Sequence, residues 1–395
     1  MKATTLAGLV SGTAIAALSL FCGGGSPASQ PTTTTPAAPP VRNYQATASV
    51  GDFLTITVDS VAHTIAYTNV TNGEMGTVSY TVGSDGAYNI TTPNGHMLKA
   101  YEIPGLALVA NMDNTGPTQN TTSLVTAILK APISLNWLQN KKFNYMQFRT
   151  NDGGMEVGSV SIDGAGSVYH QGYWPFGDLI TAWGQSGGTN SSSPFQHGSF
   201  DASQFTPDAG GNYLTLNEGG TNGTDTIFAT QGGFFVVDMG NGSMVGVPQA
   251  ASSAFDATFA GTYRALCYNK LDAIAGGNNP EGGTGRVDGY SLALSAGGGL
   301  TVQDANGATV VSTSLQPVAS TSYLQGTGKM TDTCPGLFTY RVLPSGTNTM
   351  QQDVFLTFLN GGAILFCSFS YDTAQPSGMN TQPHYSYFYG VALKQ

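Results

Sequence analysis

Apolar and polar residues alternate with a period of two along most of this chain. In the segment 77–82, Val78, Tyr80 and Val82 are separated by hydroxyl-bearing residues, and the segment 54–58 alternates aliphatic residues with threonine. Successive side chains of a strand point to opposite faces, so this pattern indicates antiparallel sheets with one buried and one solvated face. No segment shows a sustained helical stripe. The sequence therefore predicts an all-β fold.

Asn-Gly and Asp-Gly pairs separate many of these alternating segments. Both residues of such a pair tolerate the positive φ that tight hairpin turns require. The pairs begin at residues 72, 85, 94, 152, 163, 241 and 306. Their spacing predicts short strands that are joined by hairpins.

Three segments of the chain repeat one order of strands and turns, although no fixed period relates them. In each segment a glycine turn leads into an apolar strand, and a closing strand follows. The turns are Pro104-Gly105, Gly232-Gly233 and Asn360-Gly361-Gly362, and the closing strands are 123–130, 243–249 and 386–395. We expect tandem antiparallel meander units at residues 46–130, 131–250 and 251–395.

The last unit opens with a recognisable strand. The run Phe259-Ala260-Gly261-Thr262-Tyr263-Arg264 resembles the opening strand of the lipocalin and fatty-acid-binding protein group, with Tyr263 where tryptophan is usual. The resemblance implies a small up-and-down barrel. The hairpins alone fit small barrels, sandwiches or the blades of a β-propeller, and these alternatives remain open.

Composition narrows the classes of partner. Charged residues make up 9% of the chain, and the net charge is −10 with 13 basic residues. Nucleic-acid binding requires clustered Lys and Arg to displace counterions, so the sequence predicts no nucleic-acid partner. The same shortage argues against electrostatic attachment to anionic lipid.

The first 45 residues resemble an export segment. A basic start at Met1-Lys2 precedes the apolar run Leu6–Phe21, which is too short for a stable membrane span and is typical of a signal peptide, here residues 1–21. Residues 22–45 are rich in Gly, Ser, Thr and Pro and lack the apolar content that ordering requires. They are expected to form a disordered tether.

The boundary between these two segments carries a lipidation motif. Leu18-Ser19-Leu20-Phe21-Cys22 followed by glycines resembles the signal of bacterial lipoproteins, although that family usually has a small residue where Phe21 stands. The resemblance implies a lipid anchor on Cys22 and, because Gly23 follows, an outer-membrane location in the cell envelope. The alternative is cleavage after Ala14-Ile15-Ala16, which would give a soluble periplasmic or secreted protein.

The other cysteines are Cys267, Cys334 and Cys367. An exported chain can keep disulfides, so we expect one bridge and one buried thiol. A turn at Asn360-Gly361 would pair Val354 with Cys367, which places Cys334 out of register and favours Cys267 as one partner. The spacing lacks the close pairs of a zinc site, and no metal or cofactor is predicted.

An aromatic stretch in the second unit is the richest candidate for ligand binding. Its exposed rings could stack on a carbohydrate or peptide while polar neighbours form hydrogen bonds. The candidate residues are Tyr169, His170, Tyr173, Trp174, Asp178 and Trp183. The alternative is that the bulky rings close one end of a barrel or sandwich as part of its core.

No catalytic motif stands out. The histidines are isolated in sequence, and neither a nucleophile elbow nor a metalloprotease motif occurs. We therefore expect an exported, lipid-anchored surface or periplasmic protein with a binding or structural role and no enzymatic activity. The alternative function is a periplasmic hydrolase that acts on glycans or esters.

Overall fold

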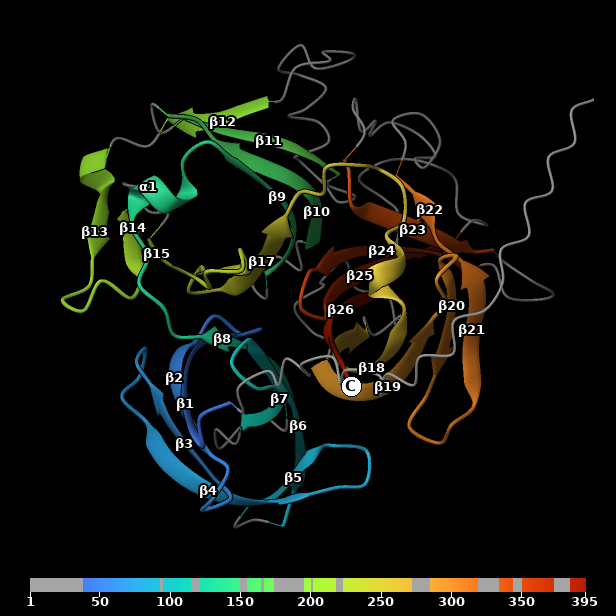
Figure 1. Cartoon of the computed structure of the whole chain (residues 1–395), viewed down its shortest axis with the longest axis horizontal. Helices are drawn as coiled ribbons and strands as arrows, with labels where there is room; N and C mark the ends of the chain where they lie inside the picture. The colour runs from blue at the N-terminus through green and yellow to red at the C-terminus, as the bar shows by residue number, and fades with distance from the viewer. Residues whose placement is uncertain are drawn as a thin grey trace, which may run out of the picture. The chain divides into compact units, whose positions relative to one another are not determined.

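The computed structural model describes residues 38–92, 95–114, 121–149, 155–164, 167–173, 195–199, 202–217, 223–271, 285–318, 334–343, 350–372 and 384–395. Residues Ala38–Gln395 form one compact unit that contains three antiparallel sheets (Figure 1). The predicted all-β class with tandem meander units is confirmed.

The first sheet is a closed barrel in which β8 pairs back onto β1. Its strands are β1 (Val41–Ala48), β2 (Phe53–Asp59), β3 (Thr64–Asn69), β4 (Met75–Val82), β5 (Tyr88–Thr91), β6 (Met97–Ile103), β7 (Ala107–Asn114) and β8 (Thr121–Leu129). Strand β1 begins at Val41, inside the segment 22–45 that was predicted as tether. That boundary is wrong because β1 hydrogen-bonds to β2 and β8 on its two sides.

The second sheet begins after the short helix α1 (Leu135–Leu138), whose Leu138 is buried. Its strand order is β12-β11-β10-β9-β17-β16-β15-β14-β13. The bounds are β9 (Lys141–Arg149), β10 (Met155–Ile162), β11 (Ser167–Tyr173), β12 (Phe195–Ser199), β13 (Phe205–Pro207), β14 (Leu214–Asn217), β15 (Thr224–Ala229), β16 (Phe235–Asp238) and β17 (Gly242–Pro248), with the 3-10 turn η1 (Ala202–Gln204) before β13.

The third sheet follows the 3-10 turn η2 (Ala257–Phe259) and has the order β21-β20-β19-β18-β26-β25-β24-β23-β22. Its strands are β18 (Gly261–Leu271), β19 (Gly285–Leu294), β20 (Gly299–Gln303), β21 (Thr309–Ser314), β22 (Gln316–Pro317), β23 (Leu337–Val342), β24 (Met350–Leu359), β25 (Ala363–Asp372) and β26 (His384–Lys394). In all three sheets the first strand pairs with the last. Among the described strands, only the first sheet is a fully closed barrel, because the edge strands β12 and β13 of the second sheet and β21 and β22 of the third do not pair with each other. Each meander still returns to its own first strand, which excludes the propeller alternative.

The last hairpin corrects the predicted register. Strand β24 pairs Phe355 with Cys367, one position away from the predicted Val354. The loop holds three residues, 360–362, because Leu359 pairs with Ala363. Both Gly361 (φ 106°) and Gly362 (φ 105°) have positive φ, which glycine adopts readily, so the chain can turn through three residues instead of two. A shift of one residue moves every side chain to the opposite face of the sheet.

The cysteines are also arranged differently from the expectation. Cys267, Cys334 and Cys367 are all buried, and Cys267 forms no disulfide, so the predicted bridge from Cys267 is wrong. Cys267 packs into the core inside the third sheet, whereas Cys334 and Cys367 belong to a core outside it. The sheet itself therefore separates Cys267 from the other two thiols.

Each sheet encloses an apolar core of its own. Inside the first barrel, Tyr44 and Ala46 of β1 pack with Val125 and Ala127 of β8. The second sheet has a corresponding inner cluster around Phe143. The third sheet has one that includes Phe338. The period-two alternation of the sequence supplies these inner faces.

A fourth core is shared by all three sheets. The alternate face of β8 contributes Leu124 and Ile128, and the second sheet contributes Met146 and Phe148 of β9. The third sheet contributes residues of β25 and β26, among them Leu365. Strands near the first and last positions of each meander are consequently buried on both faces.

Some polar groups within these contacts form hydrogen bonds across sheets. Tyr389 of β26 is 1% exposed, and its hydroxyl accepts a hydrogen bond of 3.5 Å from Ser243 Oγ of β17. Thr126 of β8 also hydrogen-bonds to this side chain. One tyrosine hydroxyl therefore joins groups from all three sheets.

Between the second and third sheets, Asn144 has a similar role. Its Nδ2 donates to the carbonyl oxygen of Pro335 at 2.8 Å and to Thr357 Oγ1 at 3.3 Å. Its Oδ1 accepts from Ser159 Oγ at 2.7 Å. The buried amide therefore has partners on both of its polar atoms, as buried polar groups require.

The contact between the first and second sheets contains a buried acid. Asp238, at the end of β16, is 5% exposed, and Thr47 Oγ1 of β1 donates to its Oδ1 at 3.1 Å. The backbones approach closely here, because a Cβ added to Gly51 would lie 2.3 Å from the carbonyl carbon of Gly240. Burial raises the pKa of Asp238 from 3.8 to about 6, and the nearby charge of Asp52 raises it further.

We expect this acid to make stability depend on pH. The folded chain holds the proton of Asp238 more tightly than the unfolded chain, so its favourable contribution is complete at low pH. This contribution decreases as the pH rises from about 4 to about 6, by up to about 3 kcal/mol. Asp238→Asn keeps acceptors for Thr47 and should remove this step, as urea unfolding across the pH range would show. If the difference in unfolding free energy between the wild type and Asp238→Asn did not vary with pH, the assignment would be contradicted.

Candidate functional site

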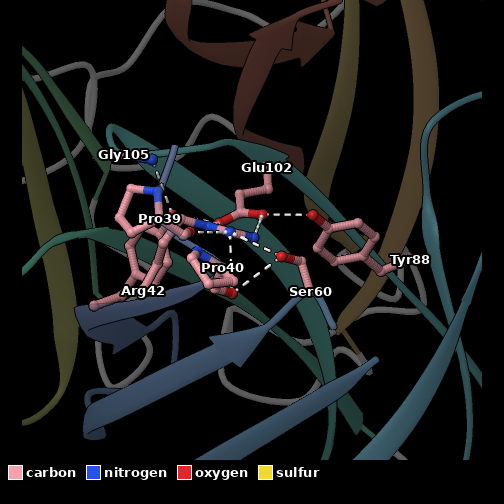
Figure 2. Close-up of polar contacts among 8 residues, drawn as sticks. Pro39, Pro40, Arg42, Ser60, Tyr88, Glu102 and Gly105 are labelled. Atoms are coloured by element: carbon pink, nitrogen blue, oxygen red, sulfur yellow. Dashed lines mark hydrogen bonds and ion pairs between the residues drawn. The ribbon is translucent and has the colours of Figure 1, made fainter. Parts of the chain in front are cut away.

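The inner face of the first barrel carries a buried ion pair near the point where the described chain begins. Arg42 of β1 and Glu102 of β6 have side chains that are 3% and 1% exposed. Arg42 Nε donates to Glu102 Oε1 at 2.6 Å, and its NH2 group donates to Oε2 at 2.8 Å (Figure 2). This two-pronged geometry is the strongest form of an arginine–carboxylate contact.

Two tyrosines complete the coordination of the carboxylate. Tyr44 donates its hydroxyl to Glu102 Oε1, and Tyr88 donates to Oε2 at 2.5 Å. Each carboxylate oxygen thus accepts two hydrogen bonds. A buried charge is tolerated only when it is paired and its lone pairs are satisfied, and here both conditions hold.

The third nitrogen of Arg42 binds the segment that enters the barrel. Its NH1 group donates to the carbonyl oxygen of Pro39 at 2.7 Å and to that of Pro40 at 3.3 Å (Figure 2). Ser60, in the turn after β2, also donates to the Pro40 carbonyl, at 3.0 Å from its Oγ and 2.9 Å from its backbone nitrogen.

An aromatic stack connects this ion pair with the surface. The ring of His63, an exposed residue with φ of 51°, stacks on Tyr80 at 5.4 Å. Tyr80 in turn stacks on Tyr88 at 4.2 Å, and Tyr88 contacts Glu102. The stack fills the space between the turn after β2 and the carboxylate.

Arg42, Tyr44 and Tyr88 keep their protons near neutral pH. The hydrogen bond with Glu102 raises the pKa of Arg42, and burial raises the pKa of Tyr44 and of Tyr88 well above the usual value. General acid–base catalysis requires a group with a pKa close to the working pH, and these three groups do not provide one. The arrangement is suited to holding a position rather than to moving a proton.

Sequence reasoning missed this cluster although it contains a usable signal. In the alternating strand 41–48, Arg42 shares the inner face with Tyr44 and Ala46, and Glu102 similarly follows Leu98 and Ala100. A charge on an otherwise apolar face of a strand indicates a buried pair or a binding site. Sequence alone does not show that the two charges meet.

The predicted ligand-binding residues lie mostly beyond the described part of the chain. Tyr169, His170 and Tyr173 are in β11, where they pair with residues 161, 160 and 157 of β10, and their side chains are outside the description. Trp174, Asp178, Trp183 and the predicted lipidation site Cys22 fall outside the described residues. These assignments remain predictions.

Among the described residues, no group of three or more His, Cys, Asp or Glu side chains is placed to hold a metal ion. None of the helices in this described part is long and apolar enough to span a membrane.

We expect Glu102→Gln to destabilise the protein by about 3–5 kcal/mol, because it leaves the Arg42 guanidinium buried without a counter-charge. Denaturant unfolding measures this loss. Lys99→Gln is the matched control, since the exposed Lys99–Asp85 pair of the same barrel (3.6 Å, Lys99 49% exposed) should contribute less than about 1 kcal/mol. Equal effects of the two substitutions would contradict the assigned role of the buried pair.

Comparison with known proteins gives little further guidance. No protein-family model matches the chain, and no curated protein matches it. Among solved structures, a protein of unknown function from the DUF3598 family of Nostoc punctiforme is 8% identical over 65% of this chain and 96% of its own, with a TM-score of 0.24. A luciferin-regenerating enzyme is 9% identical over 89% of this chain and 94% of its own, with a TM-score of 0.13. Similarities this low carry no argument about function.

Proposed function

We propose that this chain is an exported, lipid-anchored protein of the bacterial cell envelope with a binding or structural role. In this proposal, residues 1–21 direct export, Cys22 carries the lipid, and the segment after it spans the distance from the outer membrane to the β-sheets. Plain periplasmic or secreted release after residue 16 is the alternative location. The membrane is the partner in the first case, through the lipid alone.

The observation that carries the proposal is the contact between Arg42 and the carbonyls of Pro39 and Pro40. A protein that is anchored through its N-terminal segment requires a stable attachment of that segment to its folded part. Here the last residues before β1 are bound by a guanidinium that is itself held by Glu102. A load on the tether would therefore pass into a strand that is hydrogen-bonded on both sides.

The composition of the tether supports the same reading. Thr32–Thr35 and the prolines at 36, 39 and 40 favour extended backbone, which rises about 3.1 Å per residue. A segment of this length could hold the sheets tens of ångströms from a bilayer. Without a surface to stand away from, such a spacer would have little use.

The same geometry supports a role without catalysis. Glu102 is the glutamate most deeply placed in the first barrel, and both of its oxygens are engaged by Arg42, Tyr44 and Tyr88. Another described glutamate, Glu74, accepts a hydrogen bond from Tyr67 on the exposed surface. Because both oxygens of Glu102 are engaged, this residue is not free to act as one of the two carboxylates that a glycosidase uses.

Replacing Cys22 tests the anchor directly. Metabolic labelling with a clickable fatty acid should tag the wild-type protein and leave Cys22→Ala unlabelled, and the variant should leave the membrane fraction. Its melting temperature should equal that of the wild type, because Cys22 lies outside the residues that form the sheets. Equal labelling of both proteins would overturn the anchor, and a mature N-terminus at Ala17 would favour secretion.

A second experiment tests the connection between tether and barrel. Ser60→Ala removes the 3.0 Å bond to the Pro40 carbonyl and leaves the Arg42–Glu102 pair intact. Limited proteolysis between residues 38 and 41 should then become about two- to tenfold faster, with unchanged global stability. Thr57→Ala, which removes a bond to Asn43 on the outer face, is the control and should leave the cleavage rate unchanged. Equal rates in all three proteins would show that Ser60 does not secure the segment.

A further inference from the structure

The interior of the third sheet is packed with aromatic rings at one end. Where β18 begins, the ring of Phe259 stacks on Phe358 at 4.8 Å, and Phe338 meets Phe358 edge-on at 5.5 Å. The hydroxyl of Tyr263 donates to the carbonyl of Phe259 at 2.6 Å and so ties the turn η2 to this end. The inner face here is apolar and closed.

The opposite end of the same interior is polar. Where β18 ends and β19 begins, Asn269 and Asp288 lie on the inner face, because Asn269 is two residues after the inner-core residue Cys267 and Asp288 is two residues before the inward-facing Tyr290. Arg286 Nε donates to Asp288 Oδ2 at 2.8 Å, and the two side chains are 61% and 27% exposed. The inward-facing rings of Tyr290 and Phe388 are also partly exposed, so solvent reaches the inner face at this end.

Two buried polar atoms at this end have no hydrogen-bond partner within the described part of the chain. They are Oδ1 of Asn269, a residue that is 8% exposed, and Oγ of Ser368, which is fully buried. Such an atom costs about 1–3 kcal/mol of stability when it is left unsatisfied, and it therefore calls for an explanation. Both atoms lie on the inner face of the third sheet, like the inner-core residues Cys267 and Phe366 of the same strands.

A single aromatic residue lies between them. In the strand ladder, Phe388 of β26 is directly opposite Asn269 on one side and Ser368 on the other. Its ring meets Tyr290 edge-on at 5.6 Å and Phe366 at 6.0 Å. Phe388 is partly exposed, and its ring would have to turn aside for a ligand to reach both Asn269 and Ser368.

The thiol and phenol groups that face this interior, Cys267, Tyr290 and Tyr340, are neutral near pH 7 because their pKa values are raised. Burial raises the pKa of the Cys267 thiol and of Tyr340, and it raises the pKa of Tyr290 to about 12. Asp288 is already paired with Arg286. A charged ligand would find no free counter-charge here, and an apolar ligand would leave Asn269 and Ser368 unsatisfied.

We propose that the polar end of the third sheet binds a small uncharged saccharide. A sugar hydroxyl donates to Asn269 Oδ1, a second exchanges a hydrogen bond with Ser368 Oγ, and the apolar face of the ring packs on Phe388 and Tyr290. Aromatic rings combined with a few polar atoms are the usual composition of such small-molecule sites. The unsatisfied atoms are then a stability cost that is retained for binding.

Titration calorimetry of the full-length protein with glucose, galactose and N-acetylglucosamine tests this proposal. We expect at least one of them to bind with a Kd of about 1 mM or lower. This Kd should change little between low and high salt, because the contacts involve no net charge. Ser368→Ala should weaken that binding about three- to tenfold, and Asn269→Leu should weaken it at least as much. Ser368→Ala removes only an unsatisfied group, so the unfolding free energy of the free protein should stay unchanged or rise, whereas loss of a structurally required hydroxyl would lower it.

Thr339→Val is the matched control. Its Oγ1 is also buried and unpartnered within the described part, but Thr339 lies between Phe338 and Tyr340 and faces the outer side of the sheet. This substitution should affect stability like Ser368→Ala and leave saccharide binding unchanged. The proposal is overturned if none of the three sugars binds, if Ser368→Ala binds as well as the wild type, or if Thr339→Val loses binding.

Discussion

The three sheets depend on one shared apolar core, because several strands in each sheet are buried on both faces. In β8, Val125 and Ala127 pack inside the first barrel, while Leu124 and Ile128 pack between sheets. Apolar burial stabilises by about 25 cal/mol per Å², so a second buried face adds greatly to the stability of a strand. Tyr389 then joins groups of all three sheets through one hydroxyl. The meanders are consequently parts of one folded body.

The buried ion pair of the first barrel has complete hydrogen bonding. Arg42 and Glu102 satisfy each other and draw in Tyr44, Tyr88 and the backbone of the entering chain. Asp238 accepts hydrogen bonds from Thr47 and Gly240, but its largest electrostatic effect is burial, which raises its pKa. The same constraint thus produces a fixed attachment point at one place and a pH-sensitive contact at another. Their chemistry differs because one carboxylate meets a guanidinium and the other does not.

Each meander pairs its first strand with its last and so curves around an interior of its own. The three interiors can therefore differ although the strand order is related. The first barrel fills its inner face with aromatic and aliphatic groups around one ion pair. The third sheet packs phenylalanine rings at one end and leaves polar atoms of Asn269 and Ser368 without partners at the other. The topology fixes which positions face inward, and the residue placed at each position decides what that interior can do.

The sequence by itself determined the strands, their turns and the order of the meanders, because period-two alternation and glycine turns act over a few residues. It did not determine the pairing of Phe355 with Cys367, since an extra loop residue shifts the register. Nor did it show the contact between Arg42 and Glu102, which lie 60 residues apart and meet only when the barrel closes. Alternation tells which side chains share a face, but only tertiary packing decides whether that face meets water, its own barrel or another sheet.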